Sequence, residues 1–365
     1  MTPTASARLI ETDDDKKAWH QISEGSVAGQ MHQCYWWAEP LKRTGVRSKG
    51  IGLWKGSRLV GGALFRSIPV PYVRAHLTQC LAGPLHLDWD PEWADHFVLK
   101  VDELARADNS IEVAIHGCSN REIHRDIAFA FMRRGLNVSV KPGFVEAIIP
   151  LHESSLDGVW KGMNEGTRRN IKKAQKNAVE VRELRSGLEL RLAHDAWLAT
   201  ASRKGFSDVR PWELLEPVLR HCVDSRMGKV YGSFRGDRML ASIFVTFIGG
   251  QASYVYGGYV DGAESYSPNH VLHHEAIKDG LERGVKSYNL GRLTGAYNPA
   301  NPQGIDQFKL GFGARVDRRP DSIIWKRMPL VANALDWMRR QRAGKKVVEE
   351  LKRRLLSKKE EARER

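Results

Sequence analysis

The chain of 365 residues has no long apolar run, no dense set of cysteines and no apolar leader segment. No stretch approaches the roughly 18 apolar residues that a membrane-spanning helix needs. Residues 1–15 are polar and then acidic, a pattern that predicts no signal peptide. The cysteines form no CxxC pair and are widely spaced, as is typical of free buried thiols in a reducing compartment: Cys34, Cys80, Cys118 and Cys222. These absences together favour a cytoplasmic protein.

Motifs for covalent or metal-assisted catalysis are also scarce. We find no arrangement of serine, histidine and aspartate that would indicate nucleophilic catalysis. His270, His273, His274 and Glu275 have the spacing of metal ligands on a helix, but no further cysteine or acidic partner is evident. The sequence therefore predicts no metal ion, and His273 or His274 is expected to have a structural role.

The composition describes a folded protein with an excess of positive charge. Hydrophobic residues make up 42% of the chain and charged residues 27%, and the length favours two domains. The net charge is +14, and residues 326–365 alone hold 14 Lys/Arg against 6 Asp/Glu. Such a surface attracts nucleic acid, anionic lipid headgroups or phosphorylated substrates, although a merely solubilising face is the open alternative.

The most informative pattern is an internal repeat. Residues 51–65 and 230–245 both alternate apolar and polar side chains around a tight turn, at 55–58 and at 235–238. A pair of small residues follows each turn. Two similar hairpins, about 180 residues apart, predict duplication of one domain and not a short-period solenoid.

The order of helices and strands around the two hairpins agrees with this duplication. Alternating helices and strands predict an α/β (α+β) fold with helices on the faces of the sheets. We expect a first domain at 1–150 that is completed by about 320–345, a second domain at 151–319, and a basic amphipathic helical tail at 346–365. The expected elements are helices at 16–23, 91–107, 164–177, 188–203, 212–224 and 269–283, strands at 110–115, 179–184, 252–259 and 287–290, and a helical pattern from 328 onward.

The segment 287–313 has the highest density of candidate functional residues. Asn289 ends a strand in a turn, and a loop rich in glycine, proline and asparagine leads to Phe308 and Lys309. A lysine in this semi-apolar run could stabilise a developing oxyanion. The alternative is a strand lysine that points to solvent.

Several segments, taken in order, resemble the Fem-type family of non-ribosomal peptidyltransferases, especially the members that add a single residue. The resemblance is carried by GTRRNIKKA (166–174), RKGF (203–206) with Arg210-Pro211, YVYGG (254–258), YNLG (288–291) and FKLGFG (308–313), and it extends to Trp37-Ala38 in the first domain. It implies two domains of the GCN5-related N-acetyltransferase (GNAT) type in tandem. It also implies transfer of an aminoacyl group from charged tRNA to an amine of a peptidoglycan precursor peptide.

The same resemblance assigns roles to individual residues. Phe308 and Lys309 match a Phe-Lys pair whose lysine assists the tetrahedral intermediate and accommodates the tRNA end. Residues implied in binding the precursor are Lys42, Trp37, Arg210, Tyr254, Tyr256 and Asn289. The basic helix residues Arg168, Arg169, Lys172, Lys173 and Lys176 are suited to an RNA backbone, although a solvated helix face is an equal alternative. No motif indicates the oligomeric state or the transferred amino acid.

An activated ester needs no covalent nucleophile, because the step is attack by an amine with stabilisation of an oxyanion. A competing activity is that of an acyl-CoA-dependent N-acyltransferase. Residues 260–269, where a glycine-rich pyrophosphate turn would be expected, contain one glycine together with acidic residues, so CoA is not expected as a cofactor. Transfer from tRNA to a small metabolite and RNA binding without catalysis also stay open. The basic tail is compatible with docking on the inner membrane face near a lipid-linked precursor, or equally with packing on the first domain.

Overall fold

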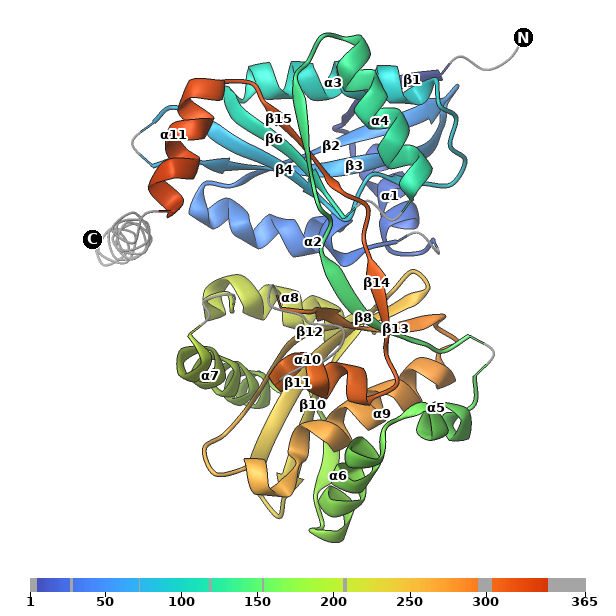
Figure 1. Cartoon of the computed structure of the whole chain (residues 1–365), viewed down its shortest axis with the longest axis vertical. Coiled ribbons are helices and arrows are strands. Elements are labelled where there is room, and N and C mark those ends of the chain that lie inside the picture. The colour runs from blue at the N-terminus through green and yellow to red at the C-terminus, as the bar shows by residue number, and fades with distance from the viewer. Residues whose placement is uncertain are drawn as a thin grey trace.

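The computed structural model describes residues 5–26, 29–71, 73–117, 120–152, 154–205, 209–294 and 304–340. Two mixed α/β domains lie end to end, each built on one twisted sheet with helices against it (Figure 1). The predicted tail at 346–365, the loop at 295–303 and Cys118 lie outside the described residues. Within these residues, no helix is long and apolar enough to cross a membrane.

The first sheet has the strand order β1-β2-β3-β4-β6-β15-β7, and β5 pairs with β3. Its strands are β1 (Ala5–Ile10), β2 (Arg47–Lys55), β3 (Arg58–Pro69), β4 (His76–Leu81), β5 (Leu85–His86), β6 (Ser110–His116), β7 (Val138–Lys141) and β15 (Ser322–Lys326). The helical segments of this domain are α1 (Asp13–Ser23), η1 (Met31–Gln33), α2 (Tyr35–Ala38), η2 (Glu39–Thr44), α3 (Trp93–Ala107), α4 (Arg121–Arg133) and α11 (Pro329–Arg340).

The second sheet has the order β14-β8-β13-β12-β11-β10-β9. Its strands are β8 (Val145–Pro150), β9 (Glu180–Leu184), β10 (Gly228–Arg235), β11 (Arg238–Ile248), β12 (Gln251–Tyr259), β13 (Ser287–Arg292) and β14 (Arg315–Arg318). Its helical segments are α5 (Leu156–Gly162), α6 (Glu165–Lys176), α7 (Gly187–Lys204), α8 (Trp212–Asp224), η3 (Glu264–Tyr266), α9 (Pro268–Glu282) and α10 (Gly304–Gly311).

The two predicted hairpins are the β2–β3 and β10–β11 pairs of the two sheets. Their turns contain Gly56 and Gly236, whose φ values of 62° and 60° favour glycine. Both pairs also contain a shift in register near the turn, between Leu53 and Trp54 and between Ser233 and Phe234. The same irregularity in the same place supports duplication of one domain, and the predicted α/β fold is confirmed.

The chain crosses between the domains twice, and the strand that follows each crossing pairs within the sheet of the other domain. After β7, at the edge of the first sheet, the chain enters the second sheet as β8; after β14, at the edge of the second sheet, it returns as β15. The two crossings lie side by side (Figure 1), because the Arg319 amide donates to the Phe144 carbonyl at 3.0 Å and the Gly143 amide donates to Asp321 at 3.0 Å. A Cβ on Gly143 would lie 2.0 Å from the Arg319 carbonyl oxygen, so this contact requires glycine.

The expected boundary between residues 150 and 151 therefore falls after the first crossing, since β8 already pairs with β13 and β14 of the second sheet. Local alternation of side chains cannot reveal this, because the partner strands of β8 lie more than 130 residues further along the chain. The chain returns to the first domain at β15 and α11, within the segment 320–345 whose described part ends at residue 340.

A third apolar cluster joins the domains in addition to the core of each sheet. Cys34, Trp36 and Trp37 of the first domain pack with Leu215 and Cys222 of α8 in the second domain. Burial raises the pKa of both thiols above the ordinary range. The segment around α2 is thus held against the second domain, and it forms one wall of the space between the two sheets.

Candidate functional site

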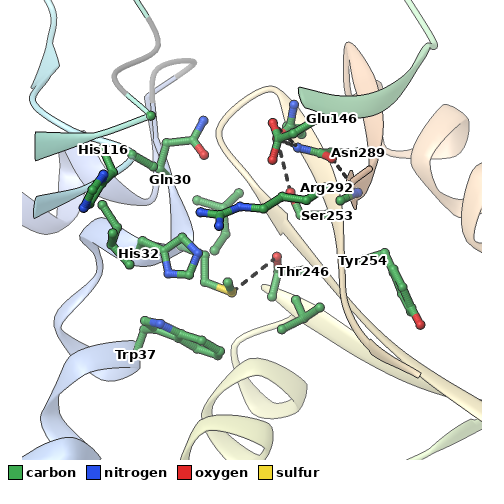
Figure 2. A pocket seen from close by; sticks show the side chains of 18 of the residues that line it. Gln30, His32, Trp37, His116, Glu146, Thr246, Ser253, Tyr254, Asn289 and Arg292 are labelled. Atoms are coloured by element: carbon green, nitrogen blue, oxygen red, sulfur yellow. Dashed lines mark hydrogen bonds between the residues drawn. The ribbon is translucent and has the colours of Figure 1, made fainter. Parts of the chain in front are cut away.

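A cavity of about 580 Å³ lies between the two domains. Gln30, His32, Trp37 and His116 project into it from the first domain, opposite Arg292 and the other labelled residues of the second (Figure 2). Residues of both crossings, Phe144 and Arg319, complete its wall. The cavity exists only because the domains meet, and such clefts are common sites of ligand binding.

The second sheet opens towards this cavity. The parallel strands β12 and β13 pair at only three positions, from Gln251–Ser287 to Ser253–Asn289. Beyond Ser253, β12 stays paired with β11 up to Tyr259, with a register shift at Phe244–Val245. The part of β12 after Ser253 therefore separates from β13, and the two strands diverge at the position of Tyr254 and Asn289.

Arginine side chains make the cavity cationic. Arg66 is only 8% exposed and pairs with no carboxylate among the described residues. Arg210 lies 3.8 Å over the Trp37 ring and donates to the Trp37 carbonyl at 2.8 Å, and burial lowers its pKa to about 10. Arg292 lies 3.8 Å over the Phe144 ring and points across the cavity towards His32 (Figure 2). Three guanidinium groups around one cavity favour an anionic ligand.

The pKa of His32 reflects its burial and the positive charge around it. Its Nδ1 atom is buried and has no hydrogen-bond partner among the described residues. Burial, followed by the positive charges of Arg66, Arg210 and Arg292, lowers the pKa of His32 to about 3. The imidazole is therefore neutral at physiological pH and can donate or accept one hydrogen bond inside the cavity.

A network of hydrogen bonds fixes the end of β13. Asn289 donates to Glu146 at 3.1 Å and accepts the Gly291 amide at 2.7 Å. Glu146 is 8% exposed and also accepts from Arg319 at 2.6 Å. The network joins β8, β13 and the second crossing, so it fixes the backbone from which Arg292 projects.

Lys309 lies directly behind this backbone. It belongs to α10, is 7% exposed, and donates to the Arg292 carbonyl at 2.5 Å. Burial lowers its pKa, while the negative charges of Asp306 and Glu146 oppose that shift. The alternative of a strand lysine in solvent is wrong, because residues 304–311 are helical and the Lys309 side chain is turned into the domain.

Aromatic side chains fill the base of the diverging strands. His273 of α9 hydrogen-bonds the Tyr288 hydroxyl at 2.7 Å and contacts the rings of Tyr254 and Phe308, with centroids 4.9 and 5.5 Å away. Burial lowers the pKa of His273 to about 3 and raises the pKa of Tyr254 to about 12. His273 is thus buried among aromatic rings, and the described residues contain no cluster of potential metal ligands.

The structure brings several of the predicted site residues together. Trp37, Arg210, Tyr254, Tyr256 and Asn289 line the cavity. The Tyr254 ring points away from its centre (Figure 2), and Tyr256 stacks on Trp197 at 5.6 Å. Phe308 and Lys309 lie behind the cavity wall.

Lys42 does not line the cavity. Its ammonium pairs with Glu39 at 2.6 Å, and its side chain is 56% exposed on η2. The corresponding positive charge on the first-domain wall is supplied by Arg66 of β3. The signal in the sequence was a charged residue within an otherwise apolar strand. Arg292 ends the strand-to-turn segment 289–292 in the region densest in candidate residues, whereas Glu146 and Arg319 had no comparable local signal.

The basic helix α6 lies on the second domain, away from the crossings (Figure 1). Arg169, Lys172, Lys173 and Lys176 are exposed, whereas Arg168 donates to the Met163 carbonyl at 2.6 Å and so helps to hold α5. The start of α6 packs against α10, since the Asn164 amide donates to the Gly311 carbonyl at 2.9 Å. This contact connects the basic helix to the helix of Lys309.

The comparisons with known proteins agree with this architecture. Residues 164–310 match the family model described as an acetyltransferase (GNAT) domain. Among solved structures, FemX is similar with a TM-score of 0.75 and 14% identity, covering 90% of this chain and 99% of FemX. The resemblance inferred from sequence is thus confirmed at the level of the fold.

Two further structures have the same fold. The C-terminal domain of a putative lysylphosphatidylglycerol synthetase from Agrobacterium fabrum gives a TM-score of 0.56 at 15% identity, covering 88% of this chain and 95% of that domain. L-PGS from Bacillus licheniformis gives 0.55 at 14% identity, covering 88% and 94%. No curated protein matches the sequence. The domain match supports an acyltransferase, and the solved structures support the fold.

Proposed function

We propose that this protein transfers an aminoacyl group from charged tRNA to an amine of a peptidoglycan precursor peptide. The observation that carries the proposal is the cationic cavity at the end of the diverging strands β12 and β13, with the buried Lys309 directly behind it. The cavity suits an acceptor that carries phosphate or carboxylate groups. The opening between the strands suits the aminoacyl end of the donor.

In the proposed step, the lone pair of the acceptor amine attacks the carbonyl carbon of the aminoacyl ester. A C–N bond forms, the C–O bond to the ribose breaks, and the proton lost by the amine ends on the ribose oxygen. The Lys309 ammonium supplies positive charge near the tetrahedral intermediate, either directly or through the Arg292 backbone that it holds. Arg66 and Arg210 bind the anionic groups of the acceptor.

The loop before α9 supports tRNA in preference to CoA as the donor. In this loop the amides of Ala263, Tyr266 and Ser267 already donate to backbone carbonyls of the loop itself. Asp261 pairs with Arg203, and Glu264 adds a second negative charge. A pyrophosphate needs free amides and few negative charges at such a helix start, so we expect CoA not to bind here.

The direct test mixes the protein with total aminoacyl-tRNA and a nucleotide-linked muropeptide, and follows the acceptor by mass spectrometry. We expect a product heavier by one aminoacyl residue, and we expect RNase treatment of the donor to abolish it. Transfer that resists RNase and requires an added acyl-CoA would contradict the proposal in favour of an acyl-CoA-dependent N-acyltransferase.

Arg210 gives a sharper test of the cavity. Arg210→Ala should raise KM for the muropeptide about tenfold to hundredfold, because a charge-assisted contact to an anion is lost. Arg283→Ala is the matched control: Arg283 also lies over an aromatic ring, Phe247 at 4.2 Å, and donates to a carbonyl in the same domain, but it is outside the cavity. Equal KM values for the two variants would contradict binding of the muropeptide in the cavity.

A further inference from the structure

Helix α11 presents apolar side chains on two sides. Ala332 and Leu335 pack inward against Val70, Ala75 and Ile111 of the first domain. On its other side the helix leaves four large apolar residues in solvent: Leu330 at 86% exposure, Val331 at 38%, Trp337 at 63% and Met338 at 44%. Solvated helix faces are ordinarily polar, so this face indicates a partner.

The loop between β3 and β4 adds to the same surface. Val70 and Ala75 in this loop pack under α11, and Val73 between them is 47% exposed. Arg74, next to Val73, is also exposed. We define the α11 surface as Val73, Leu330, Val331, Trp337 and Met338.

Charge distinguishes the possible occupants of the α11 surface. The chain from Lys326 to Arg365 holds 14 Lys/Arg against 6 Asp/Glu, so the exposed apolar residues stand at the start of a strongly basic segment. A second copy of the chain would bring two such basic segments together, and their repulsion opposes pairing. An anionic surface with an apolar interior is complementary to both features.

We propose that the α11 surface docks on a lipid bilayer that contains anionic lipids. Leu330, Trp337 and Met338 enter the boundary between headgroups and acyl chains, and the net positive charge of the sequence from Lys326 onward favours anionic headgroups. This inference goes beyond the proposed function and does not rest on it.

The fold also determines where the cavity would lie relative to the bilayer. Strand β6 begins at Ser110 near α11, where Ile111 packs against the helix, and it ends at His116 in the cavity wall. One strand length, roughly 20 Å, therefore separates α11 from the cavity wall.

The test is cosedimentation of the full chain with vesicles of phosphatidylglycerol and phosphatidylcholine, compared with vesicles of phosphatidylcholine alone. We expect binding to the anionic vesicles only, weakened by salt. Leu330→Glu and Trp337→Glu should each reduce the affinity about tenfold, because an apolar contact is lost and a negative charge is added. Leu188→Glu is the matched control, since Leu188 is 74% exposed on α7 of the second domain.

Four outcomes of the binding and association measurements would overturn the proposal. They are no binding by the unaltered chain, an equal loss in Leu188→Glu, full binding by both α11 variants, and an unaltered chain that is a dimer which Trp337→Glu dissociates. Thermal unfolding without vesicles adds a further check. Lower unfolding temperatures for Leu330→Glu and Trp337→Glu would mean that another part of the chain covers the surface, and would overturn the proposal as well. Since no aminoacyl transfer is measured, failure here leaves the proposed function standing, and the reverse also holds.

Discussion

The two domains differ most at one pair of equivalent strands. In the first domain, β4 and β6 pair in parallel up to their last residues, Leu81 and His116. In the second domain, β12 and β13 pair at three positions and then diverge at Ser253. The same topology thus gives a closed sheet in one domain and an open one in the other.

The helix that follows these strands also differs between the two domains. After β6 the first domain continues into α4, whereas after β13 the second domain continues into α10, with Lys309 turned inward. The closed domain contributes a wall with Arg66, His32 and Trp37, and the open domain contributes the strands and the buried lysine. After duplication, one copy can serve as a scaffold while the other keeps the opening on which the proposed chemistry depends.

The largest effect that tests this comparison is expected from Lys309→Met. Removal of the buried ammonium from α10 should lower aminoacyl transfer at least about 100-fold, as loss of an electrostatic contact to an oxyanion does in other enzymes. Arg125→Met, which removes an exposed cation from the corresponding helix α4, should leave the rate unchanged. Steady-state kinetics with charged tRNA measures both, and thermal unfolding verifies that Lys309→Met is folded. A normal rate of transfer by Lys309→Met would show that the Lys309 ammonium of α10 is not needed for the reaction.

The crossings provide the second test, because they should make the stability of the two domains interdependent. Gly143→Ala should lower the free energy of unfolding by about 2 kcal/mol, because the added methyl group overlaps the Arg319 carbonyl. Gly162→Ala is the control, since nothing lies within 4 Å of a Cβ there. Chemical denaturation followed by circular dichroism gives both values. Separate transitions for the two domains in the unaltered chain would be evidence against interdependence.

The smallest effect concerns acid stability. The pKa of His32 in the folded protein is about 3, below the ordinary value of 6.5, so the unfolded chain binds more protons between these values. The contribution is complete above pH 6.5 and is lost progressively as the pH falls towards 3. His32→Gln should therefore lose less stability between neutral and acid pH than the unaltered chain. The control variant His96→Gln, at an exposed histidine, should behave like the unaltered chain. A stability difference between His32→Gln and the unaltered chain that does not change with pH would contradict the lowered pKa of His32.

Local patterns predicted most of the fold. Alternation and turn residues identified both hairpins, and helical periodicity placed α8 at the same residues, 212–224, at which it is found. Local patterns could not predict that β8 belongs to the second sheet and β15 to the first, because these pairings join segments that are distant in the sequence. For residues 304–311 the sequence did not decide between a helix and a strand, because a short apolar run with one lysine suits both.

The candidate site was predicted only in part, for the same reason. Trp37, Arg210, Tyr254, Tyr256 and Asn289 were named from motifs, and all line the cavity. Arg66 comes from a segment without a motif and Arg292 directly follows the YNLG motif, and the two meet only when the two domains are packed together. Arg66 and Arg292, for example, lie on strands of different sheets.

The double crossing also limits how the two domains can move. Domains joined by a single linker can twist and separate in any direction, but two connections that run side by side leave mainly rotation about an axis through both. Here that axis passes beside Gly143 and Arg319, at the edge of the cavity. Rotation about this axis would change the width of the cavity, and the packing of Trp36 and Trp37 against α8 opposes that rotation.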